Sequence, residues 1–210
     1  IIFDNQGIAE YFSRNYSLRK SNAVIAYGGD QCTGIEPLTM KLPFSKYALC
    51  ICRIEPENNI ELILTGFSKL PAENLIFIGN WRSSAYGREL RDRFGKNKNF
   101  SLMDPIYDLQ KLNYIRGKCK LYVHGHSKGG TNPSLVEMVF YDAPIFAFDC
   151  IFNRYTLDST EHYFKSSEDL TNLILDQKVE SYESQERIQL RKKYQWSLIC
   201  QQYKDFILSV

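Results

Sequence analysis

Short apolar runs alternate with helical patterns along most of this 210-residue chain, and this alternation restricts the possible folds more than any other feature. The runs are nearly continuous in apolar residues, as in strands that are buried on both faces of a sheet. Segments with the helical spacing of apolar residues follow them after short connections. This order predicts an α/β fold with a Rossmann-like, doubly wound parallel sheet. The predicted strands are Tyr47–Ile54, Asn74–Ile78, Asn99–Met103, Cys119–His124 and, as the last strand, Pro144–Phe148.

Helical patterns occupy the connections between these strands. A proline suits the first position of a helix because its missing N–H would be unpaired there in any case, so we expect one helix to begin at Pro105. The segment 31–46 contains glycine and proline with little periodicity and is predicted to be a linker or crossover. The other predicted helices are Gly7–Tyr16, Glu57–Leu70, a polar helix ending at Arg93, Pro133–Tyr141, Glu168–Leu175 and Glu186–Leu208, with strand-like runs at Ile1–Asp4 and Ala23–Tyr27.

The charge and cysteine content exclude several classes of protein. A net charge of +2 gives no broad basic field, so no nucleic-acid partner is expected. The six cysteines lie mostly in apolar runs without a C-x-x-C spacing, beside only three histidines, so we expect buried reduced thiols in a cytosolic protein and no metal site. No apolar run reaches the roughly 18 residues of a membrane span, and no signal peptide is visible. Because the chain starts on Ile1 without methionine, we expect a piece of a longer polypeptide.

The stretch Leu121–Met138, with the sequence LYVHGHSKGGTNPSLVEM, is the strongest candidate for a functional site. A strand that enters a helix through a glycine-rich turn is where open α/β sheets bind ligands. One interpretation is a serine hydrolase, because G-H-S-K-G fits the nucleophile elbow G-x-S-x-G around Ser127. Asp149 and His162 follow Ser127 in the order of a catalytic triad.

Pro133 argues against the hydrolase. A helix that began at Ser127 would contain Pro133 in its second turn, at a cost of roughly 3 kcal/mol. A helix that begins at Pro133 with Asn132 as its cap avoids this cost. The glycine-rich loop that would supply an oxyanion hole is also missing upstream.

The second interpretation of the same stretch is a phosphate cradle. Gly129 and Gly130 permit close approach of the backbone, and the N–H groups of Gly130–Ser134 would converge at the positive end of a helix. Glu137, one turn into that helix, is placed to accept hydrogen bonds from a ribose, and Arg53, at a strand end, would clamp a phosphate. The spacing alone leaves open a plain Gly-Gly loop, a solvated Glu137 and a surface ion pair at Arg53.

These motifs resemble those of the family-4 retaining glycosyltransferases, whose GT-B fold has two Rossmann-like halves. The sequence ICRIEPENN (51–59) is similar to the family's R-x-x-x-x-K phosphate clamp, and GGTNPSLVE (129–137) to its E-x-x-x-x-x-x-x-E motif. The sequence LIFIGNW (75–81) resembles the glycine turn beside the nucleotide, YGGD (27–30) the linker between the halves, and QWSLICQQY (195–203) the closing helix.

The resemblance extends to a bacterial subgroup that includes rhamnosyltransferases of surface polysaccharide synthesis. It is carried by PENN, NW, DPIYD (104–108), HGHSKGGTNPSLVE and FDCIFNR (148–154). Two positions depart from the family pattern. Asn58 stands where the clamp has lysine, and Gly129 stands where the motif has its first glutamate. The carboxylate that family members place near the donor sugar is therefore absent, and His126 or the backbone of residues 129–131 is expected to serve instead.

The resemblance implies a nucleotide-sugar-dependent retaining glycosyltransferase with no cofactor or metal, using a nucleoside-diphosphate hexose such as dTDP-rhamnose. It implies a donor-binding domain at 27–185, the tail of an N-terminal acceptor domain with its crossover at 1–26, and a C-terminal helix at 186–210 that packs back. The candidates for catalysis are Arg53, His126 and Glu137. The expected donor-binding residues are Arg53, Asn58, Asn80, Tyr107, His126, Gly129, Gly130, Thr131, Asn132, Ser134 and Glu137, with Trp81 and Ile106 as further candidates for the base pocket. For Trp81 and Tyr107 the sequence equally allows a place in the core.

The partner implied by the resemblance is a saccharide or lipid-linked saccharide acceptor, bound through the N-terminal half at the inner face of the cell membrane. The piece alone is then expected to bind nucleotide without transferring sugar. A non-catalytic nucleotide-binding module is the alternative from a different class of function. A dinucleotide dehydrogenase is disfavoured because no G-x-G-x-x-G follows the first strand.

Overall fold

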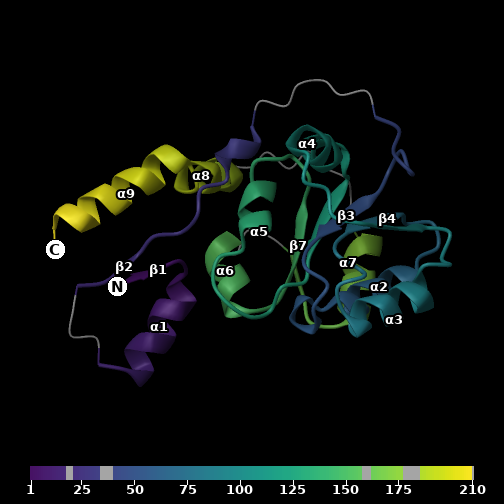
Figure 1. The fold of residues 1–210 in the computed structure, drawn as a ribbon, viewed down its shortest axis with the longest axis horizontal. Coiled ribbons are helices and arrows are strands. Elements are labelled where there is room, and N and C mark those ends of the chain that lie inside the picture. Colours follow the sequence, from purple (N-terminus) through teal and green to yellow (C-terminus); the bar gives the residue numbers. More distant parts are fainter. Residues whose placement is uncertain (18–20, 34–39, 158–161, 177–184, 210) are drawn as a thin grey trace.

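A computed structural model describes residues 1–17, 21–33, 40–157, 162–176 and 185–209 of the chain (Figure 1). Its centre is a six-stranded sheet in the order β5-β4-β3-β6-β7-β8, in which all neighbouring strands are parallel. The chain adds strands outward from β3 to β5, then returns to the middle and adds β6 to β8 on the other side. This doubly wound sheet confirms the predicted fold class. The strands are β3 (Ala48–Ile51), β4 (Leu75–Ile78), β5 (Phe100–Met103), β6 (Leu121–His124), β7 (Ile145–Phe148) and β8 (His162–Phe164).

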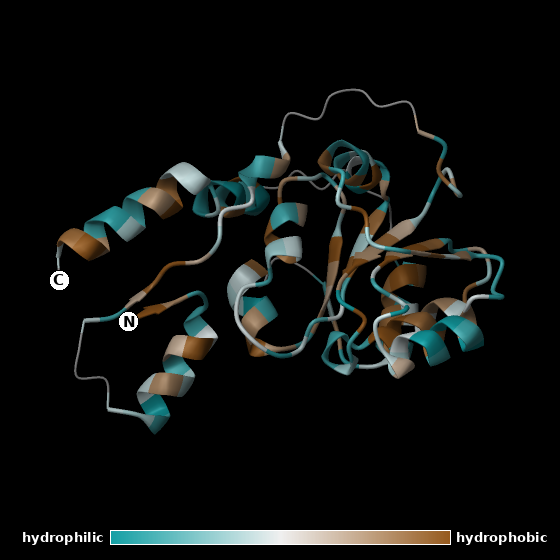
Figure 2. Cartoon of the chain, in the orientation of Figure 1, coloured by the Kyte–Doolittle hydropathy of each residue, from teal (hydrophilic) through white to brown (hydrophobic). Residues whose placement is uncertain are grey.

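Helices cover both faces of the sheet, because alternate residues of a strand point to opposite faces. Ala48 and Cys50 of β3 belong to one apolar core, whereas Leu49 of the same strand belongs to the other. Figure 2 shows these strands as a hydrophobic layer, with hydrophilic colour on the outer side of α3. The first core lies under α2 (Ile60–Ser68), α3 (Ala85–Phe94) and α7 (Ser167–Asp176), and the second under α4 (Leu109–Lys118), α5 (Pro133–Met138), α6 (Ile151–Leu157) and α8 (Gln185–Lys193).

The sheet continues beyond the strand that was predicted to be its last. β8 pairs in parallel with β7, and α6 connects the two strands. β8 has three residues, of which only Phe164 is buried. A single buried side chain is too short a pattern to reveal a strand, so the prediction that the sheet ends at Phe148 was wrong.

The start of α4 also differs from the prediction. The helix begins at Leu109 and not at Pro105, because the Asp108 carboxylate accepts a hydrogen bond from the N–H of Lys111 at 3.1 Å and caps it. Ile106 therefore lies in the loop before α4 and packs against the second core.

The helix predicted over Glu186–Leu208 is two helices, α8 and α9 (Trp196–Leu208). Tyr194 is buried between them, and its hydroxyl donates to the carbonyl of Thr156 at 2.8 Å. The N–H of Trp196 donates to the Asp30 carboxylate at 2.8 Å. Because Asp30 comes from the far end of the chain, the local pattern does not show this break.

A small unit formed by the N-terminal residues lies beside the main sheet. β1 (Ile2–Phe3) and β2 (Ala23–Val24) pair in parallel, so the strand-like run predicted to extend to Tyr27 ends at Val24. α1 (Gln6–Asn15) connects them and packs against α6. After β2 the chain forms the short helix η1 (Asp30–Cys32), and η2 (Pro56–Asn58) precedes α2. Within the described residues no helix is both long and apolar enough to cross a membrane.

Candidate functional site

The crevice between the loops that follow β3 and β6 is the place where this topology favours a ligand. β3 and β6 are neighbours, yet the chain leaves them toward opposite edges of the sheet. Open α/β sheets bind ligands at such a switch point, outside the carboxyl ends of the strands. Leu49 pairs with Tyr122, so the register places Arg53 and His126 at the same level, each two residues beyond its strand. The structure thus brings together the two segments in which the sequence predicted a site.

Side-chain hydrogen bonds join the two loops. Asn58 is buried, and its amide donates to the carbonyl of Arg53 at 2.8 Å. The other end of this amide, Oδ1, lies 2.8 Å from Nδ1 of His126. Asn59 donates to the carbonyl of Gly125 at 2.8 Å and has a left-handed backbone, with φ 50°. Asn58, predicted as a phosphate contact, therefore holds the His126 ring in place.

Ser127 is hydrogen-bonded within the same junction of the two loops, and its hydroxyl is not activated as a nucleophile. Its N–H and its hydroxyl both donate to the carbonyl of Glu57, at 2.9 and 2.8 Å. Asp149 pairs with Arg154 and Lys165. His162 opens β8, which lies two strands away from β6, about 10 Å at the usual strand spacing. The order of triad residues along the sequence is therefore not matched by their positions in space.

The glycine turn leads into α5 as Pro133 predicts. Asn132 caps the helix by accepting a hydrogen bond from the N–H of Ser134 at 3.0 Å, and Gly129 has a φ of 92°, which favours glycine. Since Pro133 has no N–H and that of Ser134 is used by the cap, fewer donors face the crevice than the sequence suggested. Among the described residues, the N–H groups of Gly129, Gly130 and Asn132 have no protein partner.

Glu137 is held by contacts on the side of α5 that faces α4 and η1. Its Oε2 forms an ion pair with Arg116, whose side chain is only 3% exposed. Its Oε1 accepts a hydrogen bond from Gln31 at 2.9 Å. The carboxylate is therefore fixed in orientation before any ligand binds, and it is not the solvated charge that the sequence left open.

The other predicted residues lie at the ends of β3, β4 and β5. Arg53 is 75% exposed and pairs with Glu55 at 3.3 Å, so its guanidinium is accessible. Asn80 is exposed, and Tyr107 is 87% exposed in the loop before α4. Trp81 is fully buried against Phe77 and donates to the carbonyl of Met103 at 3.1 Å. Trp81 is thus a core aromatic residue and not part of a base pocket.

The N-terminal unit also contributes to this crevice, which no motif of the sequence indicated. The carboxylate of Asp4 packs on Gly130, where a Cβ atom would collide with it. The hydroxyl of Thr131 donates to the carbonyl of Asp4, and the buried Asn5 donates to that hydroxyl at 3.2 Å. The available signal was the pair Asp4-Asn5 at the end of an apolar run, where strand ends carry functional side chains.

Burial controls the protonation of the ionisable groups around the crevice. Burial lowers the pKa of His124 to about 3. Burial also lowers the pKa of His126, an effect opposed by the Glu57 carboxylate and increased by the Arg53 guanidinium. Burial raises the pKa of Asp4, and hydrogen bonds from the backbone of Asp4 itself and of Thr131 partly offset this shift. At neutral pH both histidines are therefore uncharged hydrogen-bonding groups.

The parallel sheet is an α/β, Rossmann-like fold, and it matches the fold of GT-B glycosyltransferase domains. Sucrose-phosphate synthase from Thermosynechococcus elongatus superposes with a TM-score of 0.79 at 14% sequence identity, covering 100% of this chain and 58% of its own. Anabaena HepE, solved in complex with UDP-glucose, superposes with a TM-score of 0.80 at 15% identity, covering 100% of this chain and 63% of its own.

A glycosyltransferase from Rickettsia africae has a TM-score of 0.80 at 12% identity, over 98% of this chain and 63% of its own. This chain thus spans less than two thirds of each of these three proteins. No protein-family model matches the sequence, and no curated protein matches it. At sequence identities of 12–15%, this structural similarity establishes the fold alone.

Proposed function

We propose that this chain binds a nucleoside-diphosphate sugar in the crevice and forms the donor half of a glycosyltransferase. The observation that carries this proposal is the meeting of Arg53, the glycine turn and the Asn58–His126 pair at the switch point between β3 and β6. The superposition on HepE, which was solved with UDP-glucose, supports the class of ligand.

Each part of the ligand has a matching group in this crevice. The exposed guanidinium of Arg53 and the unpaired N–H groups at Gly129, Gly130 and Asn132 suit the diphosphate. The fixed carboxylate of Glu137 suits a ribose, because a carboxylate oxygen has lone pairs beyond the two contacts it makes with protein.

For the base, the exposed Tyr107 and Asn80 remain after Trp81 is excluded. An exposed aromatic ring offers a stacking surface that suits any base. The sequence resemblance favours dTDP-rhamnose as the donor, in the synthesis of a bacterial surface polysaccharide.

The reaction we propose retains the configuration of the sugar. The bond between the anomeric carbon and the diphosphate oxygen breaks, and the acceptor hydroxyl attacks the same face of that carbon. The hydroxyl proton passes to an oxygen of the departing phosphate. Arg53 and the backbone N–H groups stabilise the negative charge that develops on the diphosphate, so this step requires no metal.

The acceptor, a saccharide or lipid-linked saccharide, would bind to a second half of the enzyme. We place the end of that half in residues 1–26 and expect residues 186–210 to pack against it, at the cytoplasmic face of the membrane. The pairing of β1 with β2 beside the main sheet supports this arrangement. Without that half, the 210-residue chain is expected to bind donor and transfer nothing.

Calorimetry with UDP, GDP and dTDP tests the proposal. The Arg53→Ala variant should bind the preferred diphosphate about tenfold more weakly, because one charge-assisted contact is lost. Arg14→Ala is a matched control: Arg14 is 74% exposed and pairs with Glu10 at 3.3 Å, as Arg53 is 75% exposed and pairs with Glu55 at 3.3 Å. Arg14 lies on α1, and its loss should leave binding unchanged.

If the wild-type chain binds none of the three diphosphates, the proposal fails. Nucleotide binding without any transfer, in the longer polypeptide that contains both halves, would identify a non-catalytic module. Labelling of Ser127 by a fluorophosphonate would instead support a hydrolase.

A further inference from the structure

The tautomer of the neutral His126 ring follows from the orientation of Asn58. The amide nitrogen of Asn58 donates to the carbonyl of Arg53, so its oxygen must be the atom that faces Nδ1 of His126, at 2.8 Å. An amide oxygen only accepts hydrogen bonds, and therefore Nδ1 carries the proton. In the neutral ring Nε2 is then a hydrogen-bond acceptor.

This acceptor faces the glycine turn. A Cβ atom built on Gly129 would lie 3.6 Å from Nε2 of His126 and would meet no other neighbour. Within the described part of the chain Nε2 has no hydrogen-bond partner. The position where the sequence resemblance led us to expect a glutamate thus has an imidazole acceptor directed toward it.

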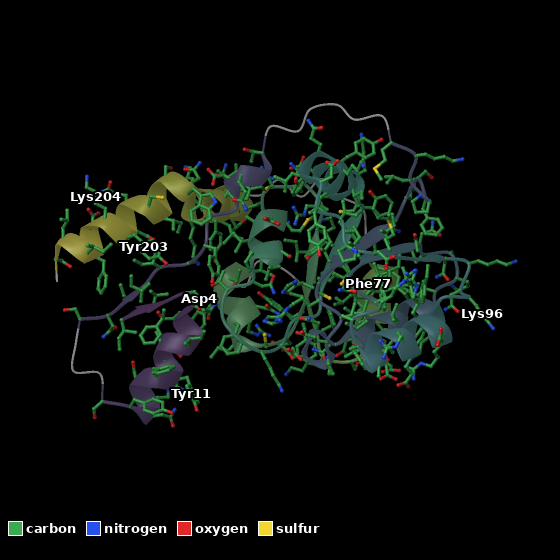
Figure 3. The ribbon with its side chains drawn as sticks, viewed as in Figure 1. Asp4, Tyr11, Phe77, Lys96, Tyr203 and Lys204 are labelled. Atoms are coloured by element: carbon green, nitrogen blue, oxygen red, sulfur yellow. The ribbon has the colours of Figure 1, made fainter. Side chains whose placement is uncertain are left out.

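A second acceptor contacts the turn at the next residue, Gly130. The carboxylate of Asp4 packs on Gly130, and Asp4 lies where the N-terminal unit meets the main domain (Figure 3). The carbonyl of Asp4 accepts a hydrogen bond from the Thr131 hydroxyl, and its carboxylate accepts one from the backbone N–H of Thr131, so the carboxylate is held beside the turn with further lone pairs available. Among the described residues no lysine or arginine pairs with it.

We propose that Asp4 and His126 together recognise hydroxyl groups of the donor sugar at the Gly129-Gly130 turn. Two acceptors at neighbouring residues of the turn favour a group that donates hydrogen bonds, as a sugar hydroxyl does. The diphosphate then lies between Arg53 and the N–H groups of the turn, and the sugar ring lies beside it at Asp4 and His126. This inference rests on the proposed function, and it identifies a carboxylate from the N-terminal unit in place of the one missing at Gly129.

Two substitutions remove one acceptor each with little change of shape. Asp4→Asn replaces a carboxylate oxygen by a donor. His126→Asn keeps a donor near Nδ1 for the bond to Asn58 and removes Nε2. Asp92→Asn, on the exposed side of α3, is the matched charge control. Thermal melting shows whether each variant is folded. If His126→Asn is not folded, the comparison of Asp4→Asn with wild type is sufficient to test the proposal.

The measurement is calorimetric affinity for three pairs of ligands: UDP and UDP-glucose, GDP and GDP-mannose, dTDP and dTDP-rhamnose. For the preferred pair, both variants should bind the nucleotide sugar about tenfold more weakly than wild type does. They should bind the free diphosphate at least as tightly as wild type, because neither substitution removes a cation. Asp92→Asn should leave both affinities unchanged.

If the variants bind the free diphosphate and the nucleotide sugar more weakly by the same factor, or bind both as wild type does, the assignment of Asp4 and His126 is overturned while the proposed function stands. A wild-type chain that binds no diphosphate contradicts the proposed function itself and, with it, this inference.

Discussion

His124 shows what burial does to an ionisable side chain at the end of a central strand. The residue is 2% exposed, its ring stacks on Tyr122, and its Nε2 atom has no hydrogen-bond partner in the part of the chain that the structure describes. Burial lowers its pKa to about 3, so the folded chain keeps the ring neutral under nearly all conditions. In the unfolded chain the same ring takes up a proton near pH 6.5.

This difference predicts a loss of stability in mild acid. Between pH 6.5 and about 3 the unfolded chain binds one more proton at His124 than the folded chain, so stability rises with pH across this window. The contribution of His124 is about 2 kcal/mol between pH 7 and pH 5. Urea unfolding at several pH values should show a weaker pH dependence for His124→Leu than for wild type. Equal dependence in the two proteins would contradict the assignment to His124.

At the scale of elements, α4 and α5 are joined by an ion pair that the sequence does not reveal. Arg116 of α4 is buried, and the Glu137 carboxylate of α5 is its anionic partner. A buried cation depends on its partner, since removing one member leaves an uncompensated charge in the interior. Glu137 therefore has a structural task in addition to the ribose contact that we propose.

Glu137→Ala should destabilise the chain by about 3–5 kcal/mol, because Arg116 would remain buried without its carboxylate. The double variant Arg116→Met/Glu137→Leu should recover most of that loss, as apolar side chains can replace a buried pair. Urea unfolding measures both changes. A double variant as unstable as Glu137→Ala would show that the ion pair is not the cause. Nucleotide binding by Glu137 variants should therefore be compared only below their melting temperatures.

At the scale of the whole molecule, apolar side chains remain exposed on the N-terminal unit and on α9. Figure 1 shows α9 extending from the main domain on the side where the N-terminal unit lies, and Figure 3 shows Tyr11 and Tyr203 on these two elements. A cavity of about 340 Å³ lies between α1 and α6. The exposed apolar side chains of the N-terminal unit and α9, together called the apolar N-terminal face, are Ile1, Tyr11, Phe12, Tyr16, Val24, Trp196, Leu198, Tyr203, Ile207 and Leu208.

Apolar surface of this kind is expected where a further part of a protein docks. Tyr11→Ser and Ile207→Ser should change the stability of the chain by less than about 0.5 kcal/mol, since these side chains are 58% and 66% exposed. The same variants should bind less of a hydrophobic dye and self-associate less at high concentration. Phe77→Ala, in the core, should cost about 3–5 kcal/mol. A similar loss in the two surface variants would show that the face is part of the folded core.

The sequence by itself determined the fold class and the start of α5. Both depend on contacts within a few residues: the apolar runs make the strands, and Pro133 with Asn132 decides where the helix begins. The sequence also predicted that Arg53 and His126 lie at the same edge of the sheet, because parallel strands place their carboxyl ends together.

The tertiary structure decided what each side chain does there. Asp4 meets Gly130, Asp30 caps α9, and Gln31 meets Glu137 across more than 100 residues of chain. No local pattern records such contacts, because they depend on how the elements pack and not on the spacing of neighbouring residues. For the same reason, local patterns did not decide that Trp81 lies in the core or that β8 belongs to the sheet. Packing also brings a carboxylate from the N-terminal unit to the turn that lacks a glutamate at Gly129.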